Sequence, residues 1–146
     1  MSVCTFFGHS ACYGLEEAAL RGTIVDLIER GADVFYVGHQ GGFDTAVYGC
    51  LKQLRKAYPH IVIGVVLAYL PTRKQEYDPY AQCSMHPEEL EAVHPKFAIE
   101  RRNLWMIERA TYCVCYVNHT WGGAWKFSRL AKRRGLTVIN LGAAEL

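Results

Sequence analysis

The sequence has no hydrophobic run that is long enough to cross a membrane as a helix. Its longest strongly apolar stretch, residues 61–70, is far shorter than the roughly 20 residues that a spanning helix needs. The first residues, Met-Ser-Val-Cys-Thr-Phe-Phe, lack the basic region and the cleavage site of a secretory signal. We therefore expect a cytoplasmic protein without a membrane partner.

The chain also has no large excess of positive or negative charge. The 16 Lys and Arg residues nearly balance the 14 Asp and Glu residues, which leaves a formal net charge of +2. Basic residues gather only at 126–134, where their spacing places most of them on the solvent side of one helix. No nucleic-acid partner is therefore expected. With 51% hydrophobic and 21% charged residues in a chain of 146, the composition is that of a folded domain with one core.

Signals for disulfides and metal ions are weak. The six cysteines do not accompany a secretory signal, so we expect reduced thiols. Cys4, Cys113 and Cys115 lie in strand-like runs, where cysteine behaves as a small buried hydrophobic residue. Cys83 and His86 have a Cys-x-x-His spacing, but no second pair matches it, and a structural zinc ion needs four ligands. No metal site is expected.

Strand-like and helix-like segments alternate along the chain. This alternation predicts a single Rossmann-like three-layer α/β domain over residues 1–146, with a mostly parallel five-stranded sheet and the strand order 3-2-1-4-5. The expected strands cover 3–8, 33–38, 61–70, 112–117 and 137–141, and the expected helices cover 15–30, 43–58, 97–110 and 122–134.

Residues 71–95 interrupt this alternation. The segment is polar, contains four prolines and predicts at most one helical turn, around 88–91. Compact domains seldom contain such a long connection unless it has a function. We expect a lid or a binding loop, with a solvated excursion as the alternative.

Three expected strand-to-helix turns are rich in glycine and polar residues. All three follow the carboxyl ends of parallel strands, where such sheets bind ligands. The turns at the opposite edge are short and ordinary. We therefore expect ligand-binding residues in the three turns: Gly8, His9 and Ser10 in the first, Gly38, Gly41, Gly42, Phe43 and Asp44 in the second, and Asn118, Thr120, Gly122, Gly123, Ala124 and Lys126 in the third.

The third turn has the composition of a phosphate site. Gly122 and Gly123 open a predicted helix, and a helix start presents free N–H groups and the positive end of the helix dipole. Thr120 and Lys126 add a hydroxyl and a positive charge. A Walker sequence and a complete Gly-x-Gly-x-x-Gly are both missing, which disfavours a P-loop NTPase or a dinucleotide-dependent dehydrogenase.

Two further candidates come from the helix predicted at 97–110. Helical spacing places Arg102 and Asn103 on its inward stripe, near the ligand edge of the sheet. An inward-facing arginine needs an anionic or polar partner, so we expect both residues at the site. Asp44 has two interpretations, because it could stabilise the start of its own helix or accept a hydrogen bond from a ribose hydroxyl or a base.

The aromatic side chains of the turns also leave alternatives open. His9, His39 and His119 each lie on one of the three turns and could bind, transfer protons or support the structure. Trp121 could stack on a base or could pack against the protein. No acid–base pair follows from the spacing of these residues, so no catalytic residue is assigned.

Motifs in a particular order give a family resemblance. They are Thr5 to His9, Phe35 to Gly38 with Gly42-Phe43-Asp44, Val65 to Pro71, Phe97-Ala98-Ile99 with Arg102-Asn103 and Trp105-Met106, Gly122-Gly123-Ala124 with Lys126-Phe127, and Val138 to Leu141. The ordered set resembles the YpsA/YoqJ-like group of the SLOG superfamily. This resemblance implies a Rossmann-like SLOG domain, a nucleotide-derived ligand and a homodimer or higher homo-oligomer.

The same superfamily includes the LOG phosphoribohydrolases, whose Arg-Lys-x-x-Met and Pro-Gly-Gly-x-Gly-Thr-x-x-Glu motifs are similar to residues 102–106 and 121–129. Here Ser128 or Arg129 occupies the place of the catalytic glutamate, and Lys126 occupies that of the threonine. Sugar transfer needs such a carboxylate. The sequence therefore predicts a protein that binds, senses or sequesters an ADP-ribose-like molecule or a nucleoside phosphate. The alternative is a LOG-like nucleoside 5'-monophosphate N-glycosidase that uses Asp44, Glu100 or another carboxylate from the segment 71–95.

Overall fold

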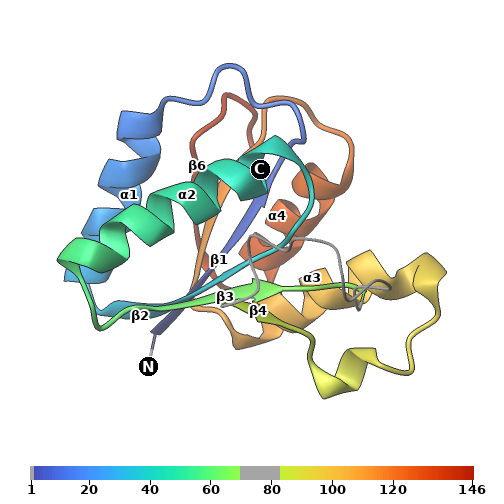
Figure 1. Ribbon diagram of the computed structural model, residues 1–146. Coiled ribbons are helices and arrows are strands. Elements are labelled where there is room, and N and C mark those ends of the chain that lie inside the picture. Colours follow the sequence, from blue (N-terminus) through green and yellow to red (C-terminus); the bar gives the residue numbers. More distant parts are fainter. Residues whose placement is uncertain (1, 70–82) are drawn as a thin grey trace.

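In the part of the chain that the structure describes, six parallel strands form one sheet, in the order β4-β3-β2-β1-β5-β6 (Figure 1). The computed structural model describes residues 2–69 and 83–146. The predicted Rossmann-like α/β fold is confirmed, and the order predicted for the five strands is that of β3-β2-β1-β5-β6. The strands are β1 (Ser2–Gly8), β2 (Ala32–Val37), β3 (Val62–Val66), β4 (Ser84–Met85), β5 (Tyr112–Tyr116) and β6 (Thr137–Asn140).

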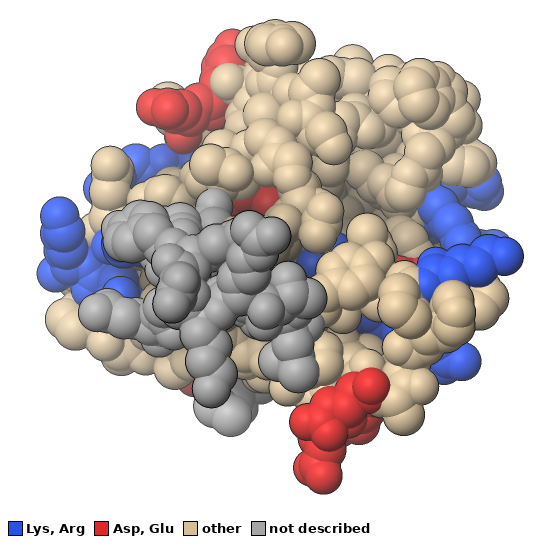
Figure 2. Space-filling view, turned by 45° about the vertical axis from the view of Figure 1, so that its right-hand side comes forward, with Lys and Arg blue, Asp and Glu red and all other residues tan. Residues whose placement is uncertain are grey.

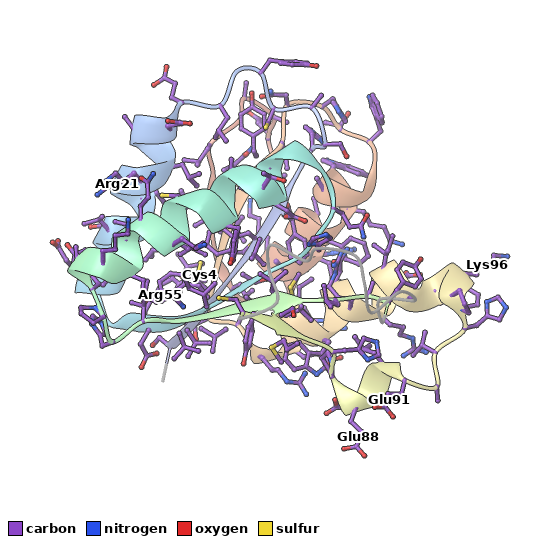
Figure 3. The ribbon with its side chains drawn as sticks, viewed as in Figure 1. Cys4, Arg21, Arg55, Glu88, Glu91 and Lys96 are labelled. Atoms are coloured by element: carbon purple, nitrogen blue, oxygen red, sulfur yellow. The ribbon has the colours of Figure 1, made fainter. Side chains whose placement is uncertain are left out.

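The sixth strand, β4, corrects the predicted count of five. It lies in the segment 71–95, where no strand was expected, and it forms only two residue pairs with β3. The amide of Val65 donates to the carbonyl of Cys83 at 2.9 Å. Figure 3 labels Arg55 near the end of α2, and Nη1 of this residue is 3.6 Å from the Cys83 sulfur. The third strand is also shorter than predicted, because β3 ends at Val66.

Helices cover both faces of the sheet (Figure 1). Buried side chains of α1 (Glu17–Glu29) and α2 (Gly41–Ala57) pack in one core cluster, with Leu20, Leu27 and Leu51 among them. Those of α3 (Ala98–Arg109) and α4 (Gly123–Arg133) pack in a second cluster, with Met106 and Phe127. No helix within the described ranges is long and apolar enough to cross a membrane.

Strand β5 divides its side chains between the two clusters, as alternation along a strand requires. Val114 and Tyr116 belong to the α1/α2 cluster, whereas Cys113 and Cys115 belong to the α3/α4 cluster. All six cysteines are free thiols. Burial raises the pKa of the Cys4 thiol, so the neutral form packs as a small apolar group.

The contact between Gly8 and Phe43 fixes the turns that follow β1 and β2 at the carboxyl edge of the sheet. The Phe43 ring is fully buried, and a Cβ atom on Gly8 would overlap it. The amide of Gly42 donates to the carbonyl of Ser10 at 2.9 Å, and Gly41 has a φ of +85°, which favours glycine. The missing side chains therefore let the start of α2 lie directly against the end of β1.

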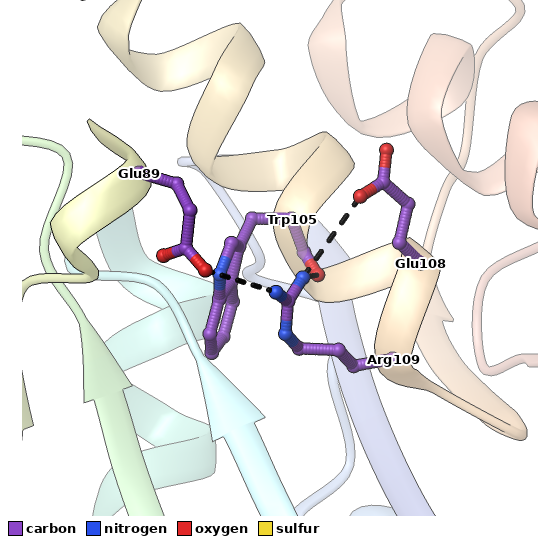
Figure 4. A network of polar contacts seen from close by, with 4 residues as sticks. All are labelled: Glu89, Trp105, Glu108 and Arg109. Carbon is purple, nitrogen blue, oxygen red and sulfur yellow. Dashed lines mark hydrogen bonds and ion pairs between the residues drawn. The ribbon is translucent and has the colours of Figure 1, made fainter. Parts of the chain in front are cut away.

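Two short 3₁₀ segments, η1 (Glu88–Leu90) and η2 (Pro95–Phe97), precede α3, and η1 lies where a helical turn was predicted. Arg109 joins η1 to α3 (Figure 4). Its guanidinium lies 4.0 Å from the Trp105 ring centre, its Nη2 is 3.4 Å from Oε1 of Glu89, and its Nη1 donates to the Trp105 carbonyl at 3.0 Å.

The side chain of Asn140 connects the ends of β5 and β6. Its Oδ1 accepts hydrogen bonds from the amides of Val117 and Gly142, both at 2.9 Å. Its Nδ2 donates to the carbonyls of Val117, at 3.1 Å, and Ala144, at 2.8 Å. The amide group therefore uses both of its donors and both acceptor positions and holds the last residues against the end of β5.

Substitution of Gly8 with alanine tests the contact with Phe43. We expect Gly8→Ala to lower the free energy of unfolding by about 1–3 kcal/mol, because the new methyl group overpacks a filled core. Gly49→Ala is the matched control, because Gly49 lies in α2 and an added methyl group there would meet open space. This variant should raise the free energy of unfolding by about 0.5–1 kcal/mol. Urea denaturation measures both. Equal stability of Gly8→Ala and the unsubstituted protein would contradict the packing argument.

Candidate functional site

A cleft of about 540 Å³ lies at the carboxyl edge of the sheet, a volume within the range of small-molecule sites. It is bounded by the turns after β1, β2 and β5, by the start of α4 and by one side of α3. The structure brings eleven of the predicted site residues together on its lining: Gly8, His9, Ser10, Gly38, Asp44, Arg102, Asn103, Asn118, Gly122, Gly123 and Ala124.

The other five predicted residues lie elsewhere. Gly41 and Gly42 line an adjacent hollow with Asp44. Phe43 is in the core. Thr120 is exposed and does not line the cleft, and Lys126 pairs with Glu100 at 3.0 Å on the surface of α3 and α4.

Arg102 is the most deeply buried charged residue of the cleft, with 3% of its surface exposed. Its Nε donates to Oδ1 of Asn103 at 2.7 Å, and its Nη1 donates to the Val66 carbonyl at 3.1 Å. Burial lowers the pKa of the guanidinium, while Asp44 acts in the opposite direction. Arginine remains protonated in proteins, so a positive charge lines the cleft, and the predicted inward orientation of Arg102 and Asn103 is confirmed.

Gly38 allows Arg102 and Asp44 to approach the same point of the backbone. A Cβ atom at Gly38 would lie 2.9 Å from Cζ and Nη1 of Arg102 and 2.9 Å from Oδ2 of Asp44. This oxygen also accepts the Gln40 amide at 2.9 Å, before the first turn of α2. Asp44 therefore stabilises the start of its helix, which is the first of the two roles considered for it from the sequence. It also lines the cleft, as the second role, binding a ligand, would require.

Burial raises the pKa of Asp44 to about 6, although the Gln40 amide and Arg102 both lower it. Desolvation thus outweighs the two favourable contacts. Among the described residues that line the cleft, Asp44 is the one carboxylate. Two residues stand where the resemblance would place the LOG glutamate, and neither lines the cleft. Ser128 is buried beside Cys115, and Arg129 lies 4.8 Å from the Trp125 ring centre.

The start of α4 opens into the cleft. Gly122 has a φ of +89° and no side chain caps the helix. Gly123 and Ala124, its first two residues, line the cleft, and a Cβ atom at Gly123 would point into open space. The first amides of a helix lack intrahelical acceptors, so this end of α4 presents donors and a positive dipole end to the cleft.

Three aromatic rings form a stack on the same lining. The rings of His9 and His119 are 3.7 Å apart, as are those of His119 and Trp121, and each pair is inclined by 17°. Nε2 of His9 accepts the Asn118 amide at 3.0 Å, and Nδ1 of His119 lies 3.0 Å from the Trp121 carbonyl, to which it donates. Burial, followed by the neighbouring His119, lowers the pKa of His9.

Several residues that line the cleft were not among those predicted. Ile99 and Met106 come from α3, on the stripe that contains Arg102, so helical spacing could have included them. Gln40 and Ala11 lie beside predicted residues in the first two turns. His119 and Trp121 are recognisable as aromatic residues of the third turn, but their parallel arrangement has no signal in the sequence.

The predicted lid or binding loop at 71–95 is described only in part. Residues 71–82 lie outside the described residues, and residues 83–95 contribute nothing to the cleft lining. Within the described ranges, no three His, Cys, Asp or Glu side chains form a group that could hold a metal ion. On the face in Figure 2, basic side chains of the described residues show at both margins of the view.

Comparisons with known proteins found no matching family model and no matching curated protein.

The raised pKa of Asp44 predicts how stability changes with pH. The pKa is about 6 in the folded protein, against 3.8 for an unperturbed aspartate, so the folded state takes up the proton more readily. Binding of this proton therefore adds to the free energy of unfolding. The added stability is fully present below about pH 4 and is lost as the pH rises through 6. Asp44→Asn, which does not titrate, should therefore gain stability relative to the parent protein between pH 4 and pH 7.

Thermal unfolding of both proteins at closely spaced pH values measures this difference. Glu100→Gln is the control, because it removes a carboxylate that lies outside the cleft and is partly open to solvent. A difference between Asp44→Asn and the parent that does not vary with pH would rule out the raised pKa.

Proposed function

We propose that the protein binds a nucleotide or nucleotide-derived molecule, such as a nucleoside phosphate or an ADP-ribose-like compound, in the cleft. The observation that supports this most directly is that two anion-attracting groups line one cavity. They are the uncapped start of α4, at Gly122 and Gly123, and the buried guanidinium of Arg102.

The phosphate is assigned to the α4 end of the cleft. Free helix amides bind phosphate well because their donors and the helix dipole act together. The two hydrogen bonds of Arg102 with Val66 and Asn103 use two of its five N–H groups. A second anionic or hydroxyl group of the ligand can therefore bind this guanidinium without displacing its support.

The cleft chemistry favours binding over hydrolysis. Glycoside hydrolases act with a pair of carboxylates at the scissile bond, whereas among the described residues that line the cleft Asp44 is the one carboxylate. A role in sensing or sequestering the ligand fits this composition. The resemblance of the ordered motifs to those of YpsA/YoqJ-like proteins favours the same assignment.

The alternative is a LOG-like N-glycosidase, and Asp44 is the observation that favours it. A carboxyl group with a pKa of about 6 is suited to general acid–base catalysis near neutral pH. This carboxylate would have to act without the glutamate found in LOG enzymes.

Charge placed at the start of α4 tests the phosphate assignment. Gly123→Asp should lower the affinity for AMP and for ADP-ribose about tenfold or more, because its carboxylate repels the ligand phosphate. Gly123→Asn, of nearly equal size and without charge, should change affinity less than about threefold. Isothermal titration calorimetry measures each dissociation constant.

The melting temperature without ligand shows whether Gly123→Asp still folds like the parent protein. An acidic residue in the first turn favours a helix, so the melting temperature of Gly123→Asp without ligand should equal or exceed that of the parent. The parent should also melt at a higher temperature when AMP or ADP-ribose is added. If neither compound binds or shifts the melting temperature, the proposed function is wrong.

Incubation with AMP separates binding from hydrolysis. We expect AMP to be recovered intact, with no adenine above the amount in a protein-free sample, when the mixture is analysed by liquid chromatography. Release of adenine by the parent protein, abolished in Asp44→Asn, would support the N-glycosidase instead. Glu100→Gln serves as the control, because Glu100 lies outside the cleft and pairs with Lys126.

A further inference from the structure

We propose that the exposed face of Trp121 is a stacking subsite for the planar base of the ligand. The inference rests on the proposed function, because it assigns the base of the molecule whose phosphate binds at the start of α4. Trp121 lines the cleft and yet remains 67% exposed. One exposed aromatic residue is common on a protein surface, so the argument depends on how this indole is held.

The indole is oriented in advance by the ring stack. One of its faces is 3.7 Å from the His119 ring, whose other face is 3.7 Å from His9. The histidines are fixed in turn, because Asn118 donates to Nε2 of His9 and Nδ1 of His119 donates to the Trp121 carbonyl. Ala143 donates to Oδ1 of Asn118 at 2.9 Å and holds this turn against the C-terminal residues.

A fixed and solvent-exposed indole face suits a planar ligand. Ordering a side chain costs conformational entropy, and an exposed ring recovers little of that cost by burial. A ring that stacks on Trp121 would extend the existing stack to four members and would bury the exposed face. Base–aromatic stacking contributes strongly to affinity and tolerates different bases, because every base has a π face.

The position of Trp121 links this subsite to the phosphate site. Trp121 directly precedes Gly122, whose positive φ turns the chain into the first residues of α4. One turn therefore presents an aromatic face and the free amides of a helix. A nucleoside monophosphate contains both complementary groups, a planar base and a phosphate, joined by one ribose.

Three probes separate the base from the phosphate. AMP contains both groups, ribose 5-phosphate lacks the base, and adenosine lacks the phosphate. Isothermal titration calorimetry should show that Trp121→Ala weakens AMP and adenosine about tenfold and leaves ribose 5-phosphate within twofold. Gly123→Asp should weaken AMP and ribose 5-phosphate and spare adenosine.

Two further variants complete the experiment. Trp121→Phe retains an aromatic face and should keep most of the AMP affinity. Trp125→Ala removes a neighbouring tryptophan that packs against Arg129 and does not line the cleft, and it should bind all three probes like the parent. AMP should also quench tryptophan fluorescence in the parent and in Trp125→Ala, but much less in Trp121→Phe.

The outcomes distinguish this proposal from the proposed function. If Trp121→Ala binds AMP as tightly as the parent while Gly123→Asp does not, the base subsite is overturned and phosphate binding stands. If Trp121→Ala weakens ribose 5-phosphate as much as AMP, Trp121 supports the turn and not a base. If the parent binds none of the three probes, the proposed function fails and the base subsite fails with it.

Discussion

The burial of one positive charge organises the carboxyl edge of this sheet. A guanidinium with 3% exposure is expensive to remove from water unless acceptors surround it. Arg102 therefore brings three parts of the chain together: its neighbour Asn103 on α3, the Val66 carbonyl at the end of β3, and Asp44 at the start of α2. Gly38 provides the space for that arrangement because it has no side chain.

Most of the fold could be predicted from the sequence because parallel strands covered on both faces give long apolar runs separated by helical spacing. The predicted order of β3, β2, β1, β5 and β6 is the observed one, although alternation alone is compatible with more than one order of parallel strands. Strand β4 could not be predicted in the same way. It has two residues, Ser84 and Met85, and it exists because β3 offers an unpaired edge to which backbone groups can bind. A strand of that length has no periodicity of its own.

The sequence was sufficient to predict which turns form the candidate site, but not which side chains of each turn line it. Phe43 and Asp44 are adjacent in one glycine-rich turn, yet the first enters the core against Gly8 and the second lines the cleft. Helix geometry sends neighbouring residues in different directions, and the exact start of the helix decides which direction each takes. Lys126 likewise lies beside the phosphate-like turn in sequence, but its ammonium group reaches Glu100.

The four hydrogen bonds of the Asn140 side chain restrict which residues can replace it during evolution. Aspartate has no hydrogen to donate to the carbonyls of Val117 and Ala144, and leucine satisfies none of the four backbone groups that Asn140 binds. The turn that begins at Asn118 follows directly from this anchor. Asn140 does not line the cleft, yet it should vary as little among true relatives as the glycines that line it. It therefore offers a position by which distant relatives can be recognised.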